Sequence, residues 1–518
     1  MISEGGLELL AKILSATAIG IDATIVEAEI DVGPGMPSFN IVGLPDTAVQ
    51  EARERVRSAL KNCGFTFPAR RVTVNLAPAS LRKTGSDFDL AIALGILTAT
   101  GQTHFNSDRT IVVGELSLSG EIRPVHGILP IAHTLSKEAN TYRLFVASAN
   151  AREGAIAGKV EVYGFRDINQ LSDFLNGNQP LVPTIIDPQS LFTYSHHEED
   201  LSEVKGQRHG KRALEISAAG GHHLLFVGPP GSGKTMLSRR LPGLLPLLSL
   251  DEAIEVTKIH SVAGLISSDH PLVISRPFRS PHHTISDIAL IGGGQWPRPG
   301  EISLSHHGVL FLDEVLEFKR NVLEALREPL EEGKITISRA SMTTTYPAKF
   351  TLVASCNPCP CGFLGDTKKT CTCSTSQIIR YRSRLSGPFL DRMDLQVEIP
   401  RLDFSDLSSN TVEENSETVR KRVEQTRLLQ QERYQKEGIH LNGEMKVRHM
   451  KKYCICSREA HDLLEKSIET LALSARAYHR ILKVARTIAD LDHSEKIDVE
   501  HVAEAIQYRT LDRKYLEF

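Results

Sequence analysis

The sequence predicts an α/β protein whose C-terminal part is helical. A short apolar run, Leu224–Val227, leads directly into a glycine-rich segment at 228–235. A second apolar run, Val309–Leu312, ends in two acidic residues, and beyond Pro400 strand-like runs give way to helical ones. Buried parallel strands are short continuous apolar runs, and ligands meet such a sheet at the carboxyl ends of its strands. These observations predict a parallel sheet with a ligand site at one edge.

Length and composition predict a globular chain of two or three domains. The 518 residues exceed the roughly 100–200 residues of one domain. The hydrophobic share of 41% and the charged share of 24% are those of ordinary folded proteins. A net charge of −3 excludes a generally basic, nucleic-acid-coating surface, so any nucleic-acid contact must be local.

The chain is expected to work in the cytoplasm, with no membrane partner. No run approaches the roughly 18 apolar residues of a membrane-spanning helix. Glu4 and Glu8 precede the first apolar stretches and no basic leader is present, so the N-terminus does not resemble a secretory signal. The eight cysteines are too few for a disulfide framework in a chain of this length.

Three folded parts and one linker are expected. Residues 1–178 alternate strand-like and helical runs, with Asp46 as the N-cap of one helix, and form an α/β domain. Residues 179–200 contain three prolines and an acidic end, which indicates a linker. Residues 201–400 carry the apolar runs named above, and residues 401–518 have the spacing of amphipathic helices.

The segment 228–235 is a complete phosphate-binding loop signature between a strand and a helix, the context that such a motif requires. Its glycines allow backbone N–H groups to turn toward phosphates. Lys234 supplies a positive charge for the β and γ phosphates, and the hydroxyl of Thr235 can ligate Mg²⁺. The predicted site for ATP and Mg²⁺ comprises Gly228, Pro229, Pro230, Gly231, Ser232, Gly233, Lys234 and Thr235.

Two further strands end in polar residues suited to the same site. Asp313 and Glu314 follow the run Val309–Leu312, so that Asp313 would hold the metal and Glu314 would orient the attacking water. Asn357 follows the apolar run 350–354, and its amide could bond the γ-phosphate or the water. The alternative for both acids is a strand capped by surface carboxylates.

A cluster of cysteines lies just beyond this third strand. Two C-x-C pairs could present four thiolates to one Zn²⁺, and reduced thiols without a metal are the alternative. Cys356, at the end of the strand, is expected to be a buried small hydrophobe. The candidate zinc ligands within the insertion 356–373 are Cys359, Cys361, Cys371 and Cys373.

The motifs, their order and their spacing resemble the AAA+ ATPases, in particular the branch of magnesium chelatase ATPase subunits and MCM helicases. The segments 279–284, 299–304 and 386–392 closely resemble the ComM/YifB family of magnesium chelatase-like proteins, and the similarity covers nearly the whole chain. This resemblance implies an AAA+ P-loop NTPase core over 201–400 and a helical lid, like the magnesium chelatase C-terminal part, over 401–518.

The resemblance also assigns roles to single residues. It implies the sensor-1 role for Asn357, the arginine finger for Arg392 and the sensor-2 role for Arg476. Arg384 competes with Arg392 for the finger, and a plain surface arginine is the alternative. An arginine finger acts across a subunit boundary, which implies a homo-oligomer, a hexameric ring. Four histidines with no partner evident from the sequence are expected to be structural, namely His282, His283, His306 and His307.

Residues 83–91 and 114–132 are similar to the proteolytic domain of Lon-type proteases, an α/β fold like that of ribosomal protein S5, which uses a Ser–Lys dyad. Here the nucleophile position is Asp87, and the lysine position falls at about Leu129. Ser86 is one place off and lacks an amine to take its proton. The domain is therefore expected to be inactive, a binding or ring-forming module as in RadA-type recombination proteins.

The segment 335–350 resembles the hairpin that MCM-type helicases insert into their pore. The runs 335–338 and 343–346 predict paired strands with 339–342 as a tight turn, which puts Arg339 at the tip. Arg339 is the candidate DNA contact, and a solvated surface arginine is the alternative.

The resemblance implies an ATPase coupled to DNA: a hexameric helicase for branch migration of recombination intermediates, serving natural transformation. Its expected partners are single-stranded and branched DNA and recombination proteins. The alternative is a chelatase-type ATPase that remodels a protein partner for metal insertion. ATP-dependent proteolysis is disfavoured by the missing dyad, and a scaffold without catalysis by the intact loop and both acids.

Overall fold

The computed structural model divides the chain into two compact units. The first comprises Met1–Thr193, Ser249–Ile274 and Pro297–Pro299, and the second comprises Tyr194–Leu248, Ser275–Trp296 and Gly300–Phe518. Within them the structure describes residues 10–192, 199–294, 296–339, 342–366, 368–385, 387–403, 413–471, 474–509 and 511.

Unit 1 is built on a seven-stranded mixed sheet of order β3-β4-β2-β1-β5-β8-β9. Long antiparallel pairs join β1 to β2 and β2 to β4, and the other neighbours are parallel. The strands are β1 Leu10–Ile19, β2 Asp22–Gly33, β3 Ser38–Val42, β4 Arg71–Ala77, β5 Thr110–Val112, β6 Glu115–Leu116, β7 Ile122–Arg123, β8 Arg143–Ala147, β9 Glu161–Phe165 and β13 Arg298–Pro299. The helices are α1 Thr47–Asn62, α2 Asp89–Ala99, α3 Ile128–Ser136, α4 Ala151–Ala155, α5 Ile168–Leu175 and α8 Leu250–Val262.

The helix expected after Asp46 is confirmed as α1. The Asp46 carboxylate accepts from the backbone N–H of Val49 at 2.8 Å, which satisfies a donor that the helix itself leaves free. Val49, Ala52 and Val56 lie on its buried face, as their spacing predicts.

Helix α8 is far from the rest of unit 1 in the sequence, which had suggested that it belongs with the ATPase core. It packs against α3, and the N–H of Gly127 donates to the carbonyl of Ser261 at 3.3 Å. The buried carboxylate of Glu153 accepts from the hydroxyl of Ser261 and from the N–H of Leu129. Residues 249–274 therefore pack as part of unit 1, although the residues on either side of them in the sequence belong to unit 2.

Unit 2 contains a five-stranded sheet of order β11-β14-β17-β10-β18, in which all pairs are parallel. Its strands, with the hairpin strands β15 and β16, are β10 Leu224–Val227, β11 Phe278–Arg279, β12 Gly292–Gly293, β14 Val309–Leu312, β15 Lys334–Arg339, β16 Met342–Pro347, β17 Thr351–Cys356 and β18 Leu395–Glu398. Its helices are α6 Arg208–Gly220, α7 Lys234–Leu244, α9 Asp287–Ile291, α10 Glu301–Leu304, α11 Arg320–Ala325, α12 Arg327–Glu332, α13 Thr375–Arg382, α14 Gly387–Leu390, α16 Ser416–Tyr434, α17 Val447–Tyr453, α18 Arg458–Leu471, α19 Ala475–Leu491 and α20 Val499–Gln507.

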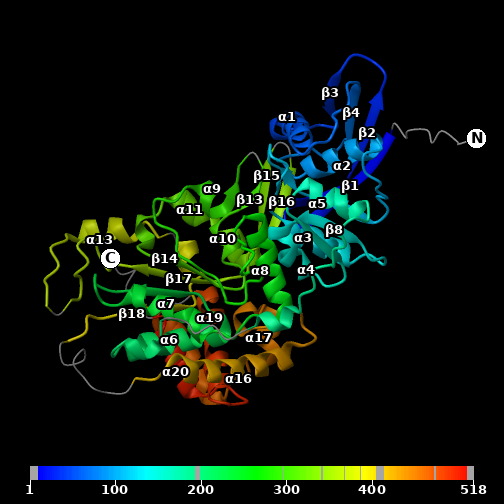
Figure 1. Cartoon of the computed structure of the whole chain (residues 1–518). Coiled ribbons are helices and arrows are strands. Elements are labelled where there is room, and N and C mark those ends of the chain that lie inside the picture. The colour runs from blue at the N-terminus through cyan, green and yellow to red at the C-terminus, as the bar shows by residue number, and fades with distance from the viewer. Residues whose placement is uncertain are drawn as a thin grey trace, which may run out of the picture. The chain divides into compact units, whose positions relative to one another are not determined.

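The sheet confirms the strands predicted from the apolar runs. In β10, β14 and β17 every residue is buried, because helices cover the sheet and leave no strand face in water. Helices α6 and α7 lie side by side against it, and α16 packs across both (Figure 1).

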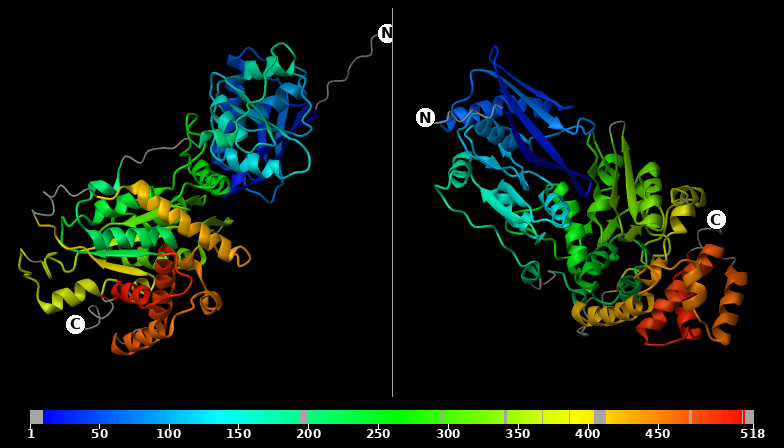
Figure 2. Two further views of the ribbon diagram at one scale, coloured as in Figure 1. Left: turned by 90° about the horizontal axis from the view of Figure 1, so that it is seen from below. Right: turned by 90° about the vertical axis from the view of Figure 1, so that its right-hand side faces the viewer.

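The part of unit 2 beyond β18 is helical, as predicted. Its helices form one group, orange to red in Figure 2. Their apolar faces share one hydrophobic cluster with the sheet, since Ile481, Ile488 and Val502 pack in the same cluster as Phe226 and Val397. The C-terminal helices therefore do not form a separate compact unit.

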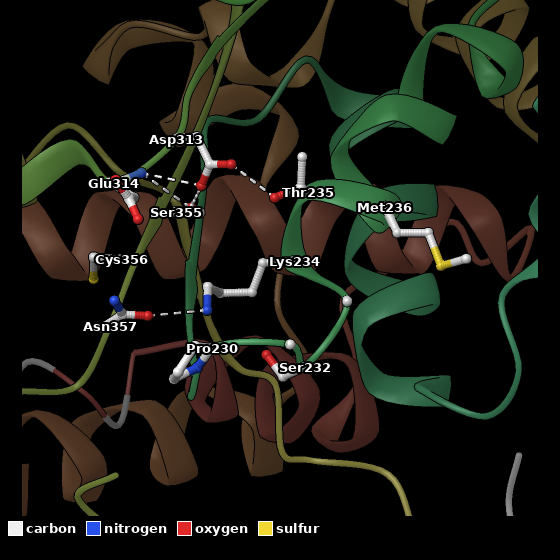
Figure 3. Close-up of a pocket in the computed structure, with 12 residues that line it drawn as sticks. Pro230, Ser232, Lys234, Thr235, Met236, Asp313, Glu314, Ser355, Cys356 and Asn357 are labelled. Atoms are coloured by element: carbon white, nitrogen blue, oxygen red, sulfur yellow. Dashed lines mark hydrogen bonds between the residues drawn. The ribbon is translucent and has the colours of Figure 1, made fainter. Parts of the chain in front are cut away.

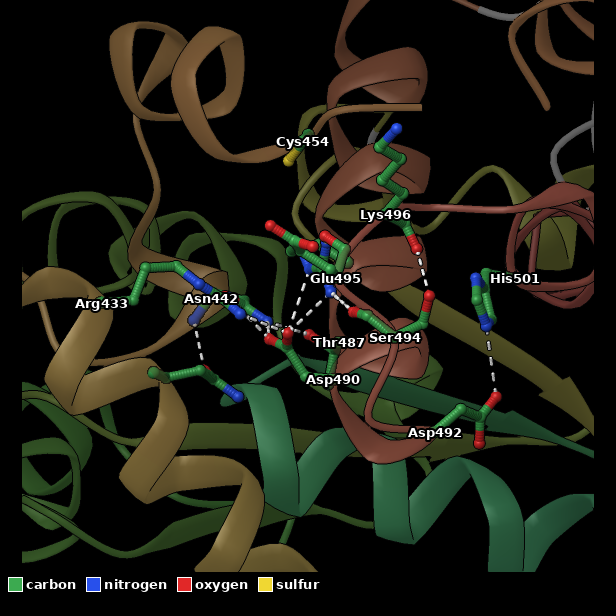
Figure 4. A network of polar contacts seen from close by, with 12 residues as sticks. Arg433, Asn442, Cys454, Thr487, Asp490, Asp492, Ser494, Glu495, Lys496 and His501 are labelled. Carbon is green, nitrogen blue, oxygen red and sulfur yellow. Dashed lines mark hydrogen bonds and ion pairs between the residues drawn. The ribbon is translucent and has the colours of Figure 1, made fainter. Parts of the chain in front are cut away.

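A buried polar network fixes α19 in place (Figure 4). The carboxylate of Asp490 accepts from Arg433 at 2.5 and 2.8 Å, from Asn442 at 2.8 Å and from Arg486 at 3.1 Å. Asn442 also donates to Thr487 at 3.0 Å. A carboxylate with only 2% exposure is stable as an anion only when it has such partners.

Some predicted features lie outside the described residues. These are the turn residues Ala340 and Ser341, Ser386 of the third motif, residues 193–198 of the expected linker, and the N-terminal stretch 1–9. Within the described part of the chain, no helix combines the length and the apolar character needed to cross a membrane.

Candidate nucleotide-binding site

One pocket of about 410 Å³ lies at the carboxyl ends of β10, β14 and β17 (Figure 3). The three strands are in register there, with Val227 opposite Cys356 and Leu312 opposite Ala354. The residues that follow these strands therefore meet at one edge of the sheet. The pocket is lined by Pro230, Gly231, Ser232, Gly233, Lys234, Thr235, Met236, Asp313, Glu314, Ser355, Cys356 and Asn357.

Two glycines of the loop have conformations that other residues rarely adopt. Gly231 has a φ of 74° and Gly233 a φ of 93°. At Gly228 the constraint is space, because a Cβ there would lie 2.2 Å from the carbonyl oxygen of Ile399. Glycine at these positions lets the loop curve over the end of the sheet.

Lys234 opens α7 and points back across the loop. Its Nζ donates to the carbonyl oxygens of Gly228 at 2.7 Å and Pro229 at 2.9 Å, and to Oδ1 of Asn357 at 3.3 Å. Burial lowers the pKa of its ammonium group. The lysine and the amide predicted from distant segments thus meet in one pocket.

Asp313 is held by two hydroxyl groups. Its Oδ2 accepts from Oγ1 of Thr235 at 2.7 Å, and its Oδ1 accepts from Oγ of Ser355. Ser355 was not predicted, although a serine near the end of the mostly apolar strand β17 was a signal. A hydroxyl and a carboxylate in contact are the oxygen ligands that Mg²⁺ prefers.

Glu314 follows Asp313 in a left-handed conformation with a φ of 51°. Its N–H donates to Oδ1 of Asp313 at 3.0 Å and its carboxylate is more than half exposed at the pocket. Oε2 of Glu314 lies 3.8 Å from Nδ1 of His283. The sequence predicts a structural role for His283 and gives no sign of this acidic neighbour.

The pocket fits a triphosphate on the evidence of one buried polar atom. The hydroxyl of Ser232 is buried, and none of the described residues accepts from it or donates to it. A buried hydroxyl without a partner costs free energy. A phosphate oxygen at the loop would supply the missing partner, and the helix that begins at Lys234 favours an anion at its N-terminus.

None of the three arginines with implied roles is among the described residues that line the pocket. Arg392 is mostly buried and pairs with Glu331. Arg384, which is about half exposed, donates to Glu317 at 2.9 Å, and Arg476 pairs with Asp391 at 3.0 Å.

The four cysteines of the predicted zinc site come together. Sγ of Cys359 lies 3.3 Å from Sγ of Cys361 and 3.6 Å from Sγ of Cys371, and all four sulfur atoms lie within 4.8 Å of one another. Tetrahedral Zn²⁺ at about 2.3 Å from each thiolate requires sulfur atoms about 3.8 Å apart. Backbone N–H groups, first that of Phe363, lower the pKa of the Cys361 thiol to about 6, which favours a ligand in its thiolate form.

In the region that resembles Lon-type proteases, none of the described residues brings an amine to Ser86. The hydroxyl of Ser86 donates to Glu115, and Leu129 is a fully buried apolar residue. Burial, with Asp89, Glu115 and Asp46 nearby, raises the pKa of Asp87 to about 7.

The predicted hairpin forms, but its strands β15 and β16 reach further toward the tip than expected, so that Arg339 and Met342, which were expected in the turn, are paired strand residues. Ile335 pairs with Tyr346, Ile337 with Thr344 and Arg339 with Met342. Arg339 is an exposed residue whose guanidinium lies against Gly293, since a Cβ on that glycine would be 2.7 Å from Nη2 of the arginine.

Comparison with known families and proteins identifies relatives along the whole chain. Residues 200–407 match the model "Magnesium chelatase, subunit ChlI", residues 28–150 match "Subunit ChlI of Mg-chelatase", and residues 413–509 match "Magnesium chelatase, subunit ChlI C-terminal". The match at 28–150 gives no support to the expected Lon-type fold, which stays a prediction.

Individual relatives agree with these matches. The competence protein ComM of Haemophilus influenzae is 45% identical over 97% of this chain and 98% of its own length. The uncharacterized protein YifB of Escherichia coli K12 is 44% identical, with the same coverage. The magnesium-chelatase 38 kDa subunit of Cereibacter sphaeroides is 28% identical over 30% of this chain and 52% of its own length. This chain therefore belongs to the ComM/YifB family and contains its magnesium chelatase-like AAA+ domain.

Proposed function

We propose that this protein is an ATP-driven motor on DNA, a hexameric helicase that promotes branch migration during recombination of incoming DNA in natural transformation. The observation that carries the proposal is the hairpin β15–β16. It directly precedes β17, whose end places Asn357 within 3.3 Å of Lys234 in the nucleotide pocket. A change at the γ-phosphate can therefore reach the hairpin through a single strand. The similarity to a competence protein points the same way.

In this proposal the chain's own residues position ATP and water. Backbone N–H groups of 228–235 and Lys234 bind the phosphates, while Thr235 and Asp313 hold Mg²⁺, which neutralises the developing charge. Glu314 orients the attacking water, and Asn357 bonds the γ-phosphate. Arg392 supplies positive charge to the neighbouring subunit's site, and Arg476 acts as sensor 2.

Residues 401–518 serve as the lid, and residues 1–178 as an inactive, ring-forming or binding module of Lon-type fold. The protein acts in the cytoplasm.

An ATPase assay with and without single-stranded or forked DNA tests this proposal. A motor on DNA is stimulated by its track, so the rate should rise when DNA is added. A chelatase-type ATPase that remodels a protein partner is the second candidate, favoured by the match of residues 200–407 to a ChlI model. The ATP hydrolysis rate of such an ATPase should not change when DNA is added, and that result would contradict the proposal of a DNA motor.

Arg339→Ala is expected to weaken DNA binding about equally for all sequences. A guanidinium at a hairpin tip contacts phosphates, which carry no sequence information. The slope of log affinity against log salt concentration should therefore fall by roughly one phosphate contact. Fluorescence anisotropy at several salt concentrations measures both effects, and strand displacement should also be suppressed.

The matched control is Lys334→Ala, which removes a cation from the base of the same hairpin. Lys334 pairs with Glu332 at 3.2 Å and is about half exposed. This variant should bind DNA as the unmodified protein does, and both variants should keep their ATPase rate without DNA. Unchanged affinity and unwinding in Arg339→Ala would exclude the hairpin tip from DNA binding.

The purified protein is expected to contain about one zinc ion per chain at the cysteine cluster. Replacing both Cys359 and Cys371 by serine leaves two thiolates, which cannot close a structural site. Metal analysis should then find no zinc. Cys63→Ser, which changes a cysteine of unit 1, should keep the zinc. Zinc-free wild-type protein would favour the alternative of reduced, unliganded thiols.

A further inference from the structure

We infer that metal at the cysteine cluster holds the nucleotide-binding loop in the shape that accepts ATP, so that the cluster is a regulatory metal site of the ATPase. The inference rests on the proposed zinc site and adds a consequence of metal occupancy for ATP binding. Its basis is that the cysteine segment contacts the phosphate-binding loop at Pro230 and is joined through α13 to the chain just beyond Glu314.

The first contact joins the cysteine turn to the phosphate-binding loop. The N–H of Gly362 donates to the carbonyl of Cys359 at 2.9 Å, which closes a tight turn around the first C-x-C pair. Gly362 lies so close to Pro230 that a Cβ would be 2.7 Å from Cδ of the proline ring. Because this ring is rigid and joined to the loop backbone, the turn supports the loop directly.

The same turn also lies beside the amide that contacts Lys234. Asn357 precedes Cys359 by two residues, and its Cγ would be 3.9 Å from a Cβ on Gly362. Its Oδ1 accepts from Lys234 at 3.3 Å. The position of the first cysteine pair therefore affects both the loop and the group facing the γ-phosphate.

The second cysteine pair leads through α13 to the chain just beyond Glu314. Ser374, directly after Cys373, caps α13 by accepting from the N–H of Gln377 at 3.3 Å. Nε of Arg382, at the end of α13, donates to the carbonyl of Pro358 at 3.2 Å. Arg384 then reaches the carbonyl of Leu316, two residues beyond Glu314, at 3.2 Å.

Four metal–thiolate bonds would join the turn that carries Cys359 and Cys361 to the segment that carries Cys371 and Cys373. Cys359 is fully buried, and the N–H of Cys361 donates to Sγ of Cys373 at 3.3 Å. A metal site formed from distant ligands contributes its binding free energy to the local fold. Losing the metal removes this cross-link, and the turn no longer has a fixed position against Pro230.

Two glycine variants distinguish the effect of the contact between Gly362 and Pro230 from the effect of the metal. Gly362→Ala places a methyl group against Pro230 and changes no ligand. Gly365→Ala is the matched control, because Gly365 has a similar φ of 80° but no atom within 4 Å of its Cβ position. The third variant replaces Cys371 and Cys373 together by serine. Zinc content and the affinity for a fluorescent ATP analogue in excess Mg²⁺ are measured for each.

We expect Gly362→Ala to keep its zinc and bind the analogue about tenfold more weakly, within the usual range of coupling between sites. The double cysteine variant should lose both zinc and affinity, and Gly365→Ala should lose neither. If the cysteine variant does not fold, Gly362→Ala decides alone. Wild-type affinity in Gly362→Ala, or in a folded zinc-free cysteine variant, would overturn the inference and leave the zinc site standing. A wild-type protein without zinc would remove both.

Discussion

Glu314→Gln is expected to bind ATP and assemble as the unmodified protein does, while its hydrolysis rate falls by about 10²–10⁴-fold. The amide keeps the size of the carboxylate but can no longer accept a proton from the attacking water. Asp313 and Thr235, which are in contact at 2.7 Å, remain to hold the metal. Binding of a fluorescent ATP analogue, size-exclusion chromatography and phosphate release measure the three properties separately.

Lys234→Ala provides the contrasting variant. It removes the ammonium group that bridges the loop carbonyls and Asn357, so it should lose nucleotide binding as well as hydrolysis. The exposed carboxylate of Glu317 offers a control nearby, since it pairs with Arg384 rather than facing the pocket. Glu317→Gln should keep binding and turnover. Hydrolysis near the wild-type rate in Glu314→Gln would exclude Glu314 as the residue that orients the water.

The location of the pocket could be predicted from the sequence because parallel strands impose it. Apolar runs of four residues identify β10 and β14, and the residues after them must meet at one edge. This rule alone was enough to predict that Asp313 and Asn357 line the pocket. Ser355 was missed because its role depends on an orientation: it lies within β17, and only the register of that strand against β14 directs its hydroxyl to Asp313.

Long-range packing could not be predicted in the same way. Helix α8 mixes apolar and polar residues, and nothing in its local sequence distinguishes a partner in unit 1 from a partner in the ATPase core. The decisive contact is the buried carboxylate of Glu153 with Ser261, two residues that lie 108 positions apart in the sequence. Burial raises the pKa of Glu153, so this contact is made at a cost in desolvation.

Ion-pair partners of the arginines were also beyond the sequence. The motif around Arg392 implies a residue that faces a neighbouring subunit, yet in this chain Arg392 is mostly buried and pairs with Glu331 of α12. The sequence contains many carboxylates that could pair with Arg392. Only the packing of α12 determines that its partner is Glu331. The two candidates for the arginine finger differ in exposure. The side chain of Arg384 is about 53% exposed and that of Arg392 about 11%.

Arg392→Ala is expected to reduce ATP hydrolysis by about 10³-fold or more, the range for loss of an arginine finger. In the proposed ring, the guanidinium must exchange the carboxylate of Glu331 for the phosphates of the neighbouring site. Glu331 is well exposed, so this exchange leaves it in water rather than buried without a partner. ATP binding should persist, because Arg392 does not line the pocket of its own chain.

Mixed rings locate the effect. When Arg392→Ala subunits are combined with Glu314→Gln subunits, each variant lacks a different half of the site. An Arg392→Ala subunit next to a Glu314→Gln subunit receives an intact finger and keeps its own glutamate, so mixing should restore hydrolysis that neither variant shows alone. Arg384→Ala is measured in parallel and should retain its rate. A normal rate in Arg392→Ala together with a loss in Arg384→Ala would assign the finger to Arg384, whose bond to Glu317 is exposed and easily exchanged.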